Sequence, residues 1–183
     1  PLYPVGCSTA FLEVWEQMGF RLPGTVVVAC GYGSQVAGLL YALEALRPGG
    51  ARCRVVAVNT ARYPALTDAF ASGATDTTAA GSGPTLAEGI ACRNPVRGAE
   101  MLAGIRASGG TVVAVDDHAI VDAVRDLARV GALVEPTGAV AFAGWRHLAA
   151  TVWLADPEDC CVVLSGSGLK TASLVADLLH ERH

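Results

Sequence analysis

The stretch "VVVACGYGSQVAGLLYAL", residues 26–43, decides the fold. It begins with a short run of β-branched and small apolar residues, which is typical of a buried strand. Apolar side chains then recur at helical spacing, at Val36, Leu39, Leu40 and Leu43. Glycines at positions 31 and 33 separate the two patterns. The sequence therefore predicts a strand, a tight glycine turn and a helix.

The glycine turn has two interpretations. A helix entered through such a turn presents unpaired backbone N–H groups at the positive end of its dipole, where a phosphate binds readily. Alternatively, the turn joins the strand to the helix and holds no ligand. The motif is not a P-loop, because no Gly-Lys-Ser/Thr follows, and it is not G-x-G-x-x-G, because the third glycine, Gly38, comes too late.

Composition narrows the class of protein. The 183 residues are 52% hydrophobic but lack an uninterrupted apolar run of about 18 residues, so we expect one globular domain that does not enter a membrane. The net charge of -4, with no basic cluster, argues against binding to nucleic acid or an anionic membrane surface. Six cysteines without C-x-x-C spacing favour free thiols in a reducing, cytoplasmic compartment over disulfides or a metal site.

Further strands and helices alternate along the chain. Strands are predicted at Thr25–Ala29, Cys53–Asn59, Thr111–Val115 and from Cys160 onward. The predicted helices run from Ser8 or Thr9 to about Gly19, from Gln35 to Leu46 before "RPGG" at 47–50, over 64–73, from Val96 to Ala107, from Asp116 or Asp117 to about Val130, from Gly138 to Ala149 and from Leu169 to His180. Residues 72–84 are small, polar and glycine-rich, which indicates a surface loop or the rim of an active site.

This alternation predicts an α/β fold with an open parallel sheet and helices on both faces, because the strands are continuous apolar runs. In such sheets, ligands bind beyond the carboxyl ends of the strands. Two of the predicted strands end in glycine turns, at 31–34 and 165–168. If these strands are neighbours, both turns can line one site.

Five segments in order resemble a known family. They are "GCSTAFLEVWEQMG" (6–19), "VVVACGYGSQVAGLLYALEAL" (26–46), "TLAEGIACRNPVRG" (85–98), "VDDHAIVDAVRDLARVGALVEPTGAVAFAG" (115–144) and "VVLSGSGLK" (162–170). Together they resemble the C-terminal part of the large domain of the fold-type II pyridoxal-phosphate enzymes, the tryptophan synthase β superfamily. The match is best with the threonine synthases, and it extends over nearly the whole chain.

The resemblance implies a cofactor site for pyridoxal 5′-phosphate. Its phosphate would be wrapped by the backbone N–H groups of Gly31, Tyr32, Gly33, Ser34 and Gln35. Tyr32 and Gln35 depart from the Ser, Gly or Asn that the family usually has there. By the same resemblance, the Ser165 hydroxyl would meet the pyridine nitrogen and Glu135 would lie close to the cofactor. The alternative is that both residues have structural roles only: Ser165 in a turn after the strand, and Glu135 as an acidic residue at a helix N-terminus ahead of Pro136.

The lysine that forms the Schiff base in this family lies in the N-terminal half, and nothing in this chain resembles that segment. The only lysine is Lys170, which matches the family's G-L-K lysine instead. We therefore expect no catalytic residue here: residues 1–183 would be a single α/β domain, the C-terminal portion of a longer or split enzyme that needs its N-terminal portion or a complementary chain. A non-catalytic partner subunit of the same fold is the alternative.

The complete enzyme is expected to convert O-phosphohomoserine into threonine, with a related amino-acid elimination, including that of serine or threonine dehydratases, as an alternative. A homodimer is implied by the family. A nucleotide-binding α/β module is a third interpretation. It requires an acidic residue at the end of the second strand to bind ribose hydroxyls, and Asn59 and Thr60 stand there instead.

Overall fold

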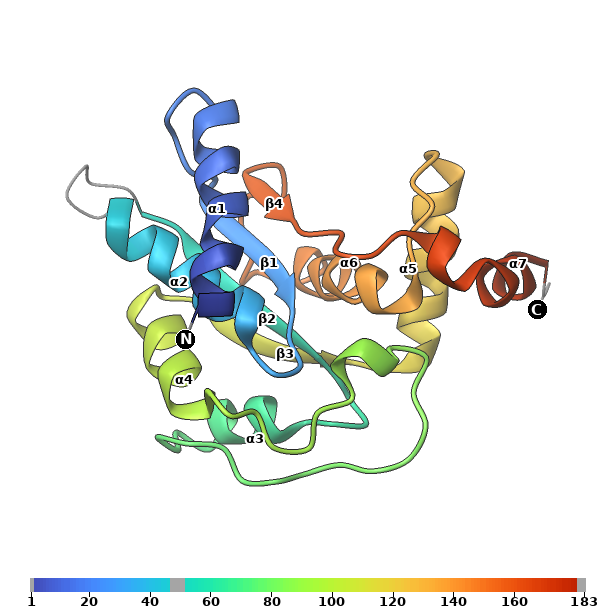
Figure 1. Ribbon diagram of the computed structural model, residues 1–183, viewed down its shortest axis with the longest axis horizontal. Coiled ribbons are helices and arrows are strands. Elements are labelled where there is room, and N and C mark those ends of the chain that lie inside the picture. The colour runs from blue at the N-terminus through green and yellow to red at the C-terminus, as the bar shows by residue number, and fades with distance from the viewer. Residues whose placement is uncertain (1, 47–51, 181–183) are drawn as a thin grey trace.

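The computed structural model describes residues 2–46 and 52–180. Four strands form one sheet in the order β3-β2-β1-β4 (Figure 1). They are β1 (Thr25–Ala29), β2 (Arg54–Thr60), β3 (Thr111–Val115) and β4 (Cys160–Val162). All three neighbouring pairs are parallel. The predicted parallel α/β sheet is confirmed.

Helices cover both faces of the sheet. In Figure 1 the first four helices lie to the left of the strands or below them, and the last three lie to the right. The first group comprises α1 (Leu2–Gln17), α2 (Ser34–Leu46), α3 (Ala65–Ala71) and α4 (Gly98–Ala107). The second comprises α5 (Asp117–Arg129), α6 (Pro136–Ala149) and α7 (Ala172–His180). Two short 3₁₀ helices complete the described elements, η2 (Glu88–Ile90) and η3 (Gly168–Thr171).

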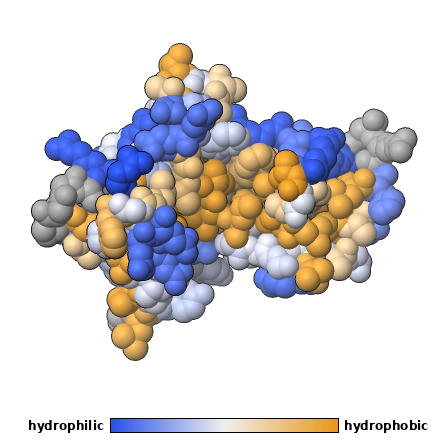
Figure 2. Space-filling view, turned by 90° about the horizontal axis from the view of Figure 1, so that it is seen from above, coloured by the Kyte–Doolittle hydropathy of each residue, from blue (hydrophilic) through white to orange (hydrophobic). Residues whose placement is uncertain are grey.

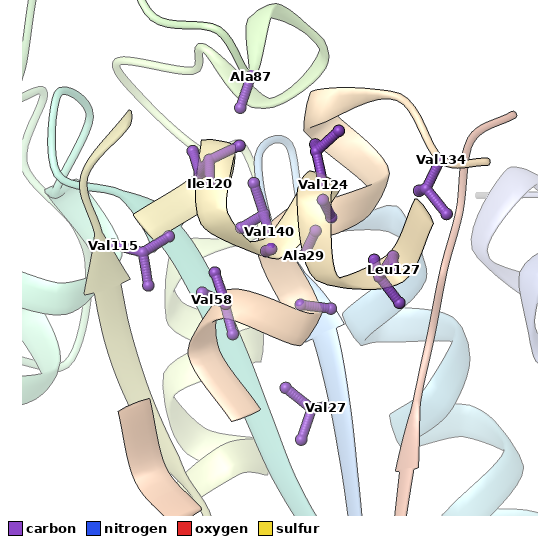
Figure 3. Packing of buried hydrophobic residues seen from close by; sticks show 14 of the residues in the cluster. Val27, Ala29, Val58, Ala87, Val115, Ile120, Val124, Leu127, Val134 and Val140 are labelled. Atoms are coloured by element: carbon purple, nitrogen blue, oxygen red, sulfur yellow. The ribbon is translucent and has the colours of Figure 1, made fainter. Parts of the chain in front are cut away.

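Alternate side chains of the central strands enter two separate cores. Val26 and Val28 of β1 pack with α1, α2, α3 and α4, whereas Val27 and Ala29 pack with α5 and α6. Figure 3 shows the second core, in which Val27 and Val58 face the helical residues Val124, Leu127 and Val140. Because both faces of β1 are buried, apolar residues occupy every position of this strand after Thr25.

The neighbouring strands β1 and β4 bring distant parts of the chain together. Val27 of β1 is the register partner of Val162 of β4, and the Val163 N–H donates to the Val27 carbonyl at 3.0 Å. Because the two strands are parallel, the glycine turn at 31–34 and the turn at 165–168 both follow carboxyl ends at the same edge of the sheet. β1 and β4 are therefore neighbours, which is the condition under which both turns can line one site.

The first helix begins earlier than predicted. α1 starts at Leu2, and Ser8 and Thr9 do not cap it; their hydroxyls donate to the Val5 and Gly6 carbonyls one turn back, at 2.7 and 2.8 Å. Pro4 is compatible with this start because a proline in the first turn forfeits no helical hydrogen bond. Gly19 has a left-handed φ of 69°, as expected for a residue that ends a helix.

The last helix begins later than predicted. Residues Gly168–Thr171 form η3, and the Ser167 hydroxyl caps it by accepting from the Leu169 N–H at 3.3 Å, so α7 starts only at Ala172. Residues 72–84 lack regular structure, as predicted. The predicted helix stop at 47–50 lies outside the described residues. None of the helices within 2–46 and 52–180 combines the length and the apolar character needed to cross a membrane.

Candidate functional site

The end of β1 is held by β2. The Cys30 N–H donates to the Val58 carbonyl at 2.8 Å, and the Cys30 carbonyl accepts from the Asn59 side-chain amide at 2.6 Å. The side-chain oxygen Oδ1 of Asn59 in turn accepts from the Thr67 hydroxyl at 3.1 Å. Both ends of this buried amide are therefore used within the protein, which weakens the interpretation of this position as a ribose-binding site.

The two glycines of the turn are required for different reasons. Gly31 is buried, and a Cβ atom at this position would lie 2.7 Å from the Ile90 Cα. Gly33 has a left-handed φ of 94°, and its Cβ would overlap the thioether of Met101. The chain can thus pass beneath η2 and turn into α2 only because both side chains are missing.

The first turn of α2 offers backbone donors. α2 begins at Ser34, and its first helical bond runs from the Ala37 N–H to the Gly33 carbonyl at 2.9 Å. The preceding N–H groups, of Ser34, Gln35 and Val36, have no acceptor within the described part of the chain. Tyr32 is 61% exposed beside them. A glycine cradle followed by free helical amides has the chemistry of an anion site.

The second turn lies against the start of α6. The Glu135 N–H donates to the Gly166 carbonyl at 3.1 Å, and the Gly168 N–H donates to the Leu133 carbonyl at 3.0 Å. The Glu135 carboxylate occupies the space that a side chain at Gly166 would need. Ser165 precedes this junction and is exposed. The structure therefore brings Glu135 into direct contact with the Ser165 turn.

Glu135 forms an ion pair with Lys170. The Lys170 Nζ lies 3.1 Å from one carboxylate oxygen and donates to the other at 3.2 Å. The Lys170 side chain is 67% exposed and that of Glu135 is 14% exposed. Glu135 occupies the N-cap position of α6, but its side chain makes no capping hydrogen bond. Sequence reasoning missed this pair, because 35 positions separate the two residues.

The segment that contains η2 connects the two turns. Ile90 lies against Gly31, and the neighbouring Gly89 N–H donates to the Thr137 hydroxyl at 3.2 Å in the first turn of α6. Thr137 is two residues after Glu135. The glycine turn, η2 and the start of α6 therefore form one continuous set of contacts at the carboxyl edge of the sheet. The sequence carried no local signal for the roles of Ile90 and Thr137.

The cysteines are free thiols, as predicted. Burial raises the pKa of Cys30, directly before the glycine turn, from 9.0 to about 12, and the neighbouring Cys92 adds to the increase. The Cys30 thiol therefore stays protonated at neutral pH. No group of three or more His, Cys, Asp or Glu side chains suited to a metal ion occurs within residues 2–46 and 52–180.

Curated relatives with this sequence pattern are threonine synthases. The chain is 28% identical over 180 residues to threonine synthase of Methanosarcina acetivorans, covering 96% of this chain and 44% of that protein. It is 27% identical over 169 residues to threonine synthase of Methanocaldococcus jannaschii, covering 90% and 42%. The chain thus spans less than half the length of these relatives.

A solved structure with the same fold is that of a T.th. threonine deaminase, with a TM-score of 0.73 and 28% sequence identity. The similarity covers 91% of this chain and 52% of that one. The family model described as "Pyridoxal-phosphate dependent enzyme" matches residues 1–166, which include the glycine turn, Glu135 and Ser165. The chain therefore belongs to the family of pyridoxal-phosphate dependent enzymes.

Proposed function

We propose that this chain is the pyridoxal-phosphate-binding part of a threonine synthase-like lyase that acts on O-phosphohomoserine or a related amino acid. Two observations support the proposal: family membership, and the similarity to two threonine synthases over at least 90% of the chain. The observation that carries it is the parallel pairing of β1 with β4, because it places the glycine turn and the Ser165 turn at one edge of the sheet.

The residues present fit the cofactor. The Gly31–Gln35 turn would hold the phosphate, since Gly31 and Gly33 leave no side chain in the cradle and the first amides of α2 lack acceptors in the described structure. Ser165 would offer a neutral hydroxyl to the pyridine nitrogen, and Glu135 would lie close to the cofactor. Bound pyridoxal phosphate supplies an electron sink for a carbanion of the substrate. The chain's own contribution is to orient the ring from its two ends.

We further propose that a second segment or chain provides the reactive lysine. Lys170 is the only lysine, and its amine is paired with Glu135. Figure 2 shows an apolar band across the middle of one face, with hydrophilic surface on either side. An exposed apolar surface of this kind favours a partner, and the N-terminal portion of the same enzyme is the partner we propose. Homodimer formation and a cytoplasmic location complete the proposal.

Titration with pyridoxal phosphate tests the cofactor assignment. We expect pyridoxal phosphate to quench the tryptophan fluorescence of the chain when it binds. The chain alone should not show the visible absorption band of lysine-bound cofactor. Adding the N-terminal portion of a related threonine synthase is expected to produce that band. Ser34→Ala should weaken binding, because the hydroxyl at the phosphate turn is lost, whereas the control Ser8→Ala on α1 should not. Absence of binding by the chain and by the pair would refute the assignment.

The substrate is tested on the same pair. A threonine synthase-like enzyme releases inorganic phosphate from O-phosphohomoserine and forms threonine. The 28% identity with a threonine deaminase structure favours a second candidate, a dehydratase, which would instead release ammonia from threonine. A non-catalytic partner subunit would give neither product, even where cofactor is bound. The measured product thus separates the three functions.

A further inference from the structure

Three side chains form a hydrogen-bonded chain beside the candidate site. They are Thr60 at the end of β2, Thr85 in the loop before η2 and Asp117 in the first turn of α5. The Thr85 hydroxyl donates to an Asp117 carboxylate oxygen at 2.7 Å and lies 3.2 Å from the Thr60 hydroxyl. Thr60 and Thr85 are buried. The proposed function assigns no role to these three residues.

The direction of the hydrogen bonds follows from the donors available. A carboxylate only accepts, so the single Thr85 hydroxyl proton is used toward Asp117. The Thr60 hydroxyl must then donate to Thr85, and the Thr60 oxygen accepts from the Arg62 N–H at 3.3 Å. Both hydroxyl groups therefore donate and accept, and the series of hydrogen bonds ends at the Asp117 carboxylate. Such a network holds its members in one arrangement.

The network holds the backbone that leads into η2. The same Asp117 oxygen accepts from the Leu86 N–H at 3.2 Å, and the Thr85 oxygen accepts from the Ala87 N–H at 3.3 Å. Ala87 is fully buried, and Figure 3 shows its side chain pointing toward the core beside Ile120. The Ala87 carbonyl then accepts from the Ile90 N–H at 3.0 Å. A series of hydrogen bonds thus links Asp117 to Ile90.

We propose that Thr85 and Asp117 are positioning residues for the phosphate turn, and that they act through Ile90. The backbone of Ile90 lies against Gly31 with no space for a side chain between them, so a shift of η2 must be transmitted to the turn. The inference rests on the proposed role of Gly31–Gln35 in phosphate binding. Neither positioning residue touches the cofactor in this proposal.

Thr85→Val tests the inference, because valine keeps the shape of threonine and removes the hydroxyl. Thr85→Ser keeps the hydroxyl and should restore wild-type behaviour. Asp117→Asn, which keeps an oxygen acceptor without the charge, should have a smaller effect. Thr151→Val is the matched control, since this hydroxyl also donates within the protein, to the Leu148 carbonyl at 2.7 Å, but beyond the opposite end of α6 from Glu135.

The first measurement needs no ligand. In Thr85→Val we expect altered amide NMR shifts at Gly31 and Gly33, and hydrogen exchange of the Ala37 amide about tenfold faster, as the loss of one buried hydrogen-bond partner allows. Thr85→Ser and Thr151→Val should match the wild type. Unchanged shifts and exchange at these amides in Thr85→Val would overturn the inference, even if the variant melts at a lower temperature.

The second measurement compares two ligands. We expect Thr85→Val to bind pyridoxal phosphate about tenfold more weakly, which corresponds to about 1.4 kcal/mol. Its affinity for pyridoxal, which lacks the phosphate, should stay unchanged, whereas a general loss of structure would lower both affinities. An equal loss for the two ligands would refute the inference. If the wild type fails to bind pyridoxal phosphate both alone and together with the N-terminal portion, the proposed function fails, and the ligand-free measurement still decides the linkage between Thr85 and the turn.

Discussion

Gly31→Ala is the substitution that tests the packing of the glycine turn most directly. The added Cβ would lie 2.7 Å from the Ile90 Cα and 3.1 Å from the Ile90 Cβ. Carbon atoms pack best at about 3.5–4.0 Å, so η2 has to move by nearly 1 Å. Overpacking of this kind costs about 2 kcal/mol, which lowers the melting temperature by about 4–8 °C in a chain of this length.

Thermal unfolding followed by circular dichroism measures this loss, and fluorescence titration measures pyridoxal-phosphate binding in parallel. Gly6→Ala is the control, because no atom lies within 4 Å of its added Cβ inside α1, and it should stabilise the chain by about 0.5–1 kcal/mol. Adding Ile90→Ala to the Gly31 variant should not restore stability, because the nearest atom belongs to the main chain. A Gly31→Ala chain with unchanged melting temperature would refute the close packing described here.

Three further outcomes follow from the geometry. Asp116→Ala removes the N-cap of α5 and should cost about 1 kcal/mol in urea unfolding. Burial raises the pKa of Cys30 and Cys53 from 9.0 to about 12, so the folded chain retains these protons more tightly than the unfolded chain. The contribution of the two thiols to the free energy of unfolding is therefore complete below pH 9. This free energy should fall as the pH rises from 9 toward 12, which denaturant unfolding at a series of pH values measures. Lys170→Met should cost less than about 1 kcal/mol in denaturant unfolding, because its ion pair with Glu135 is largely solvent-exposed on the lysine side.

The strands could be predicted from the sequence because each contains a continuous apolar run, which in β1 reflects burial on both sides. β1 and β3 have the predicted bounds, Thr25–Ala29 and Thr111–Val115. The start of α1 could not be predicted as reliably, because Ser8 and Thr9 have the residue type of a cap. In the folded helix their hydroxyls bind carbonyls of the preceding turn instead.

The candidate site could be predicted only in part from the sequence. The glycine turn has a local pattern, and the family resemblance pointed to Glu135 and Ser165. The contacts that hold the site depend on tertiary structure. Asp116 and Asp117 are equivalent as predicted helix starts, but Asp116 caps α5, whereas Asp117 accepts from the Thr85 hydroxyl 32 positions away. No pattern within a short window distinguishes the two neighbouring carboxylates.

The pairing of β1 with β4 has a consequence for biosynthesis. The register joins Thr25 to Cys160, so the two turns of the candidate site come to one edge of the sheet only after most of this chain has left the ribosome. Closing so long a loop is slow, because the entropy is lost before the contacts between the two strands stabilise the fold. The edge strand that leads to the second turn is only three residues long. In a nascent chain the glycine turn and the Ser165 turn can therefore come to the same edge of the sheet only after residues 160–168 have emerged.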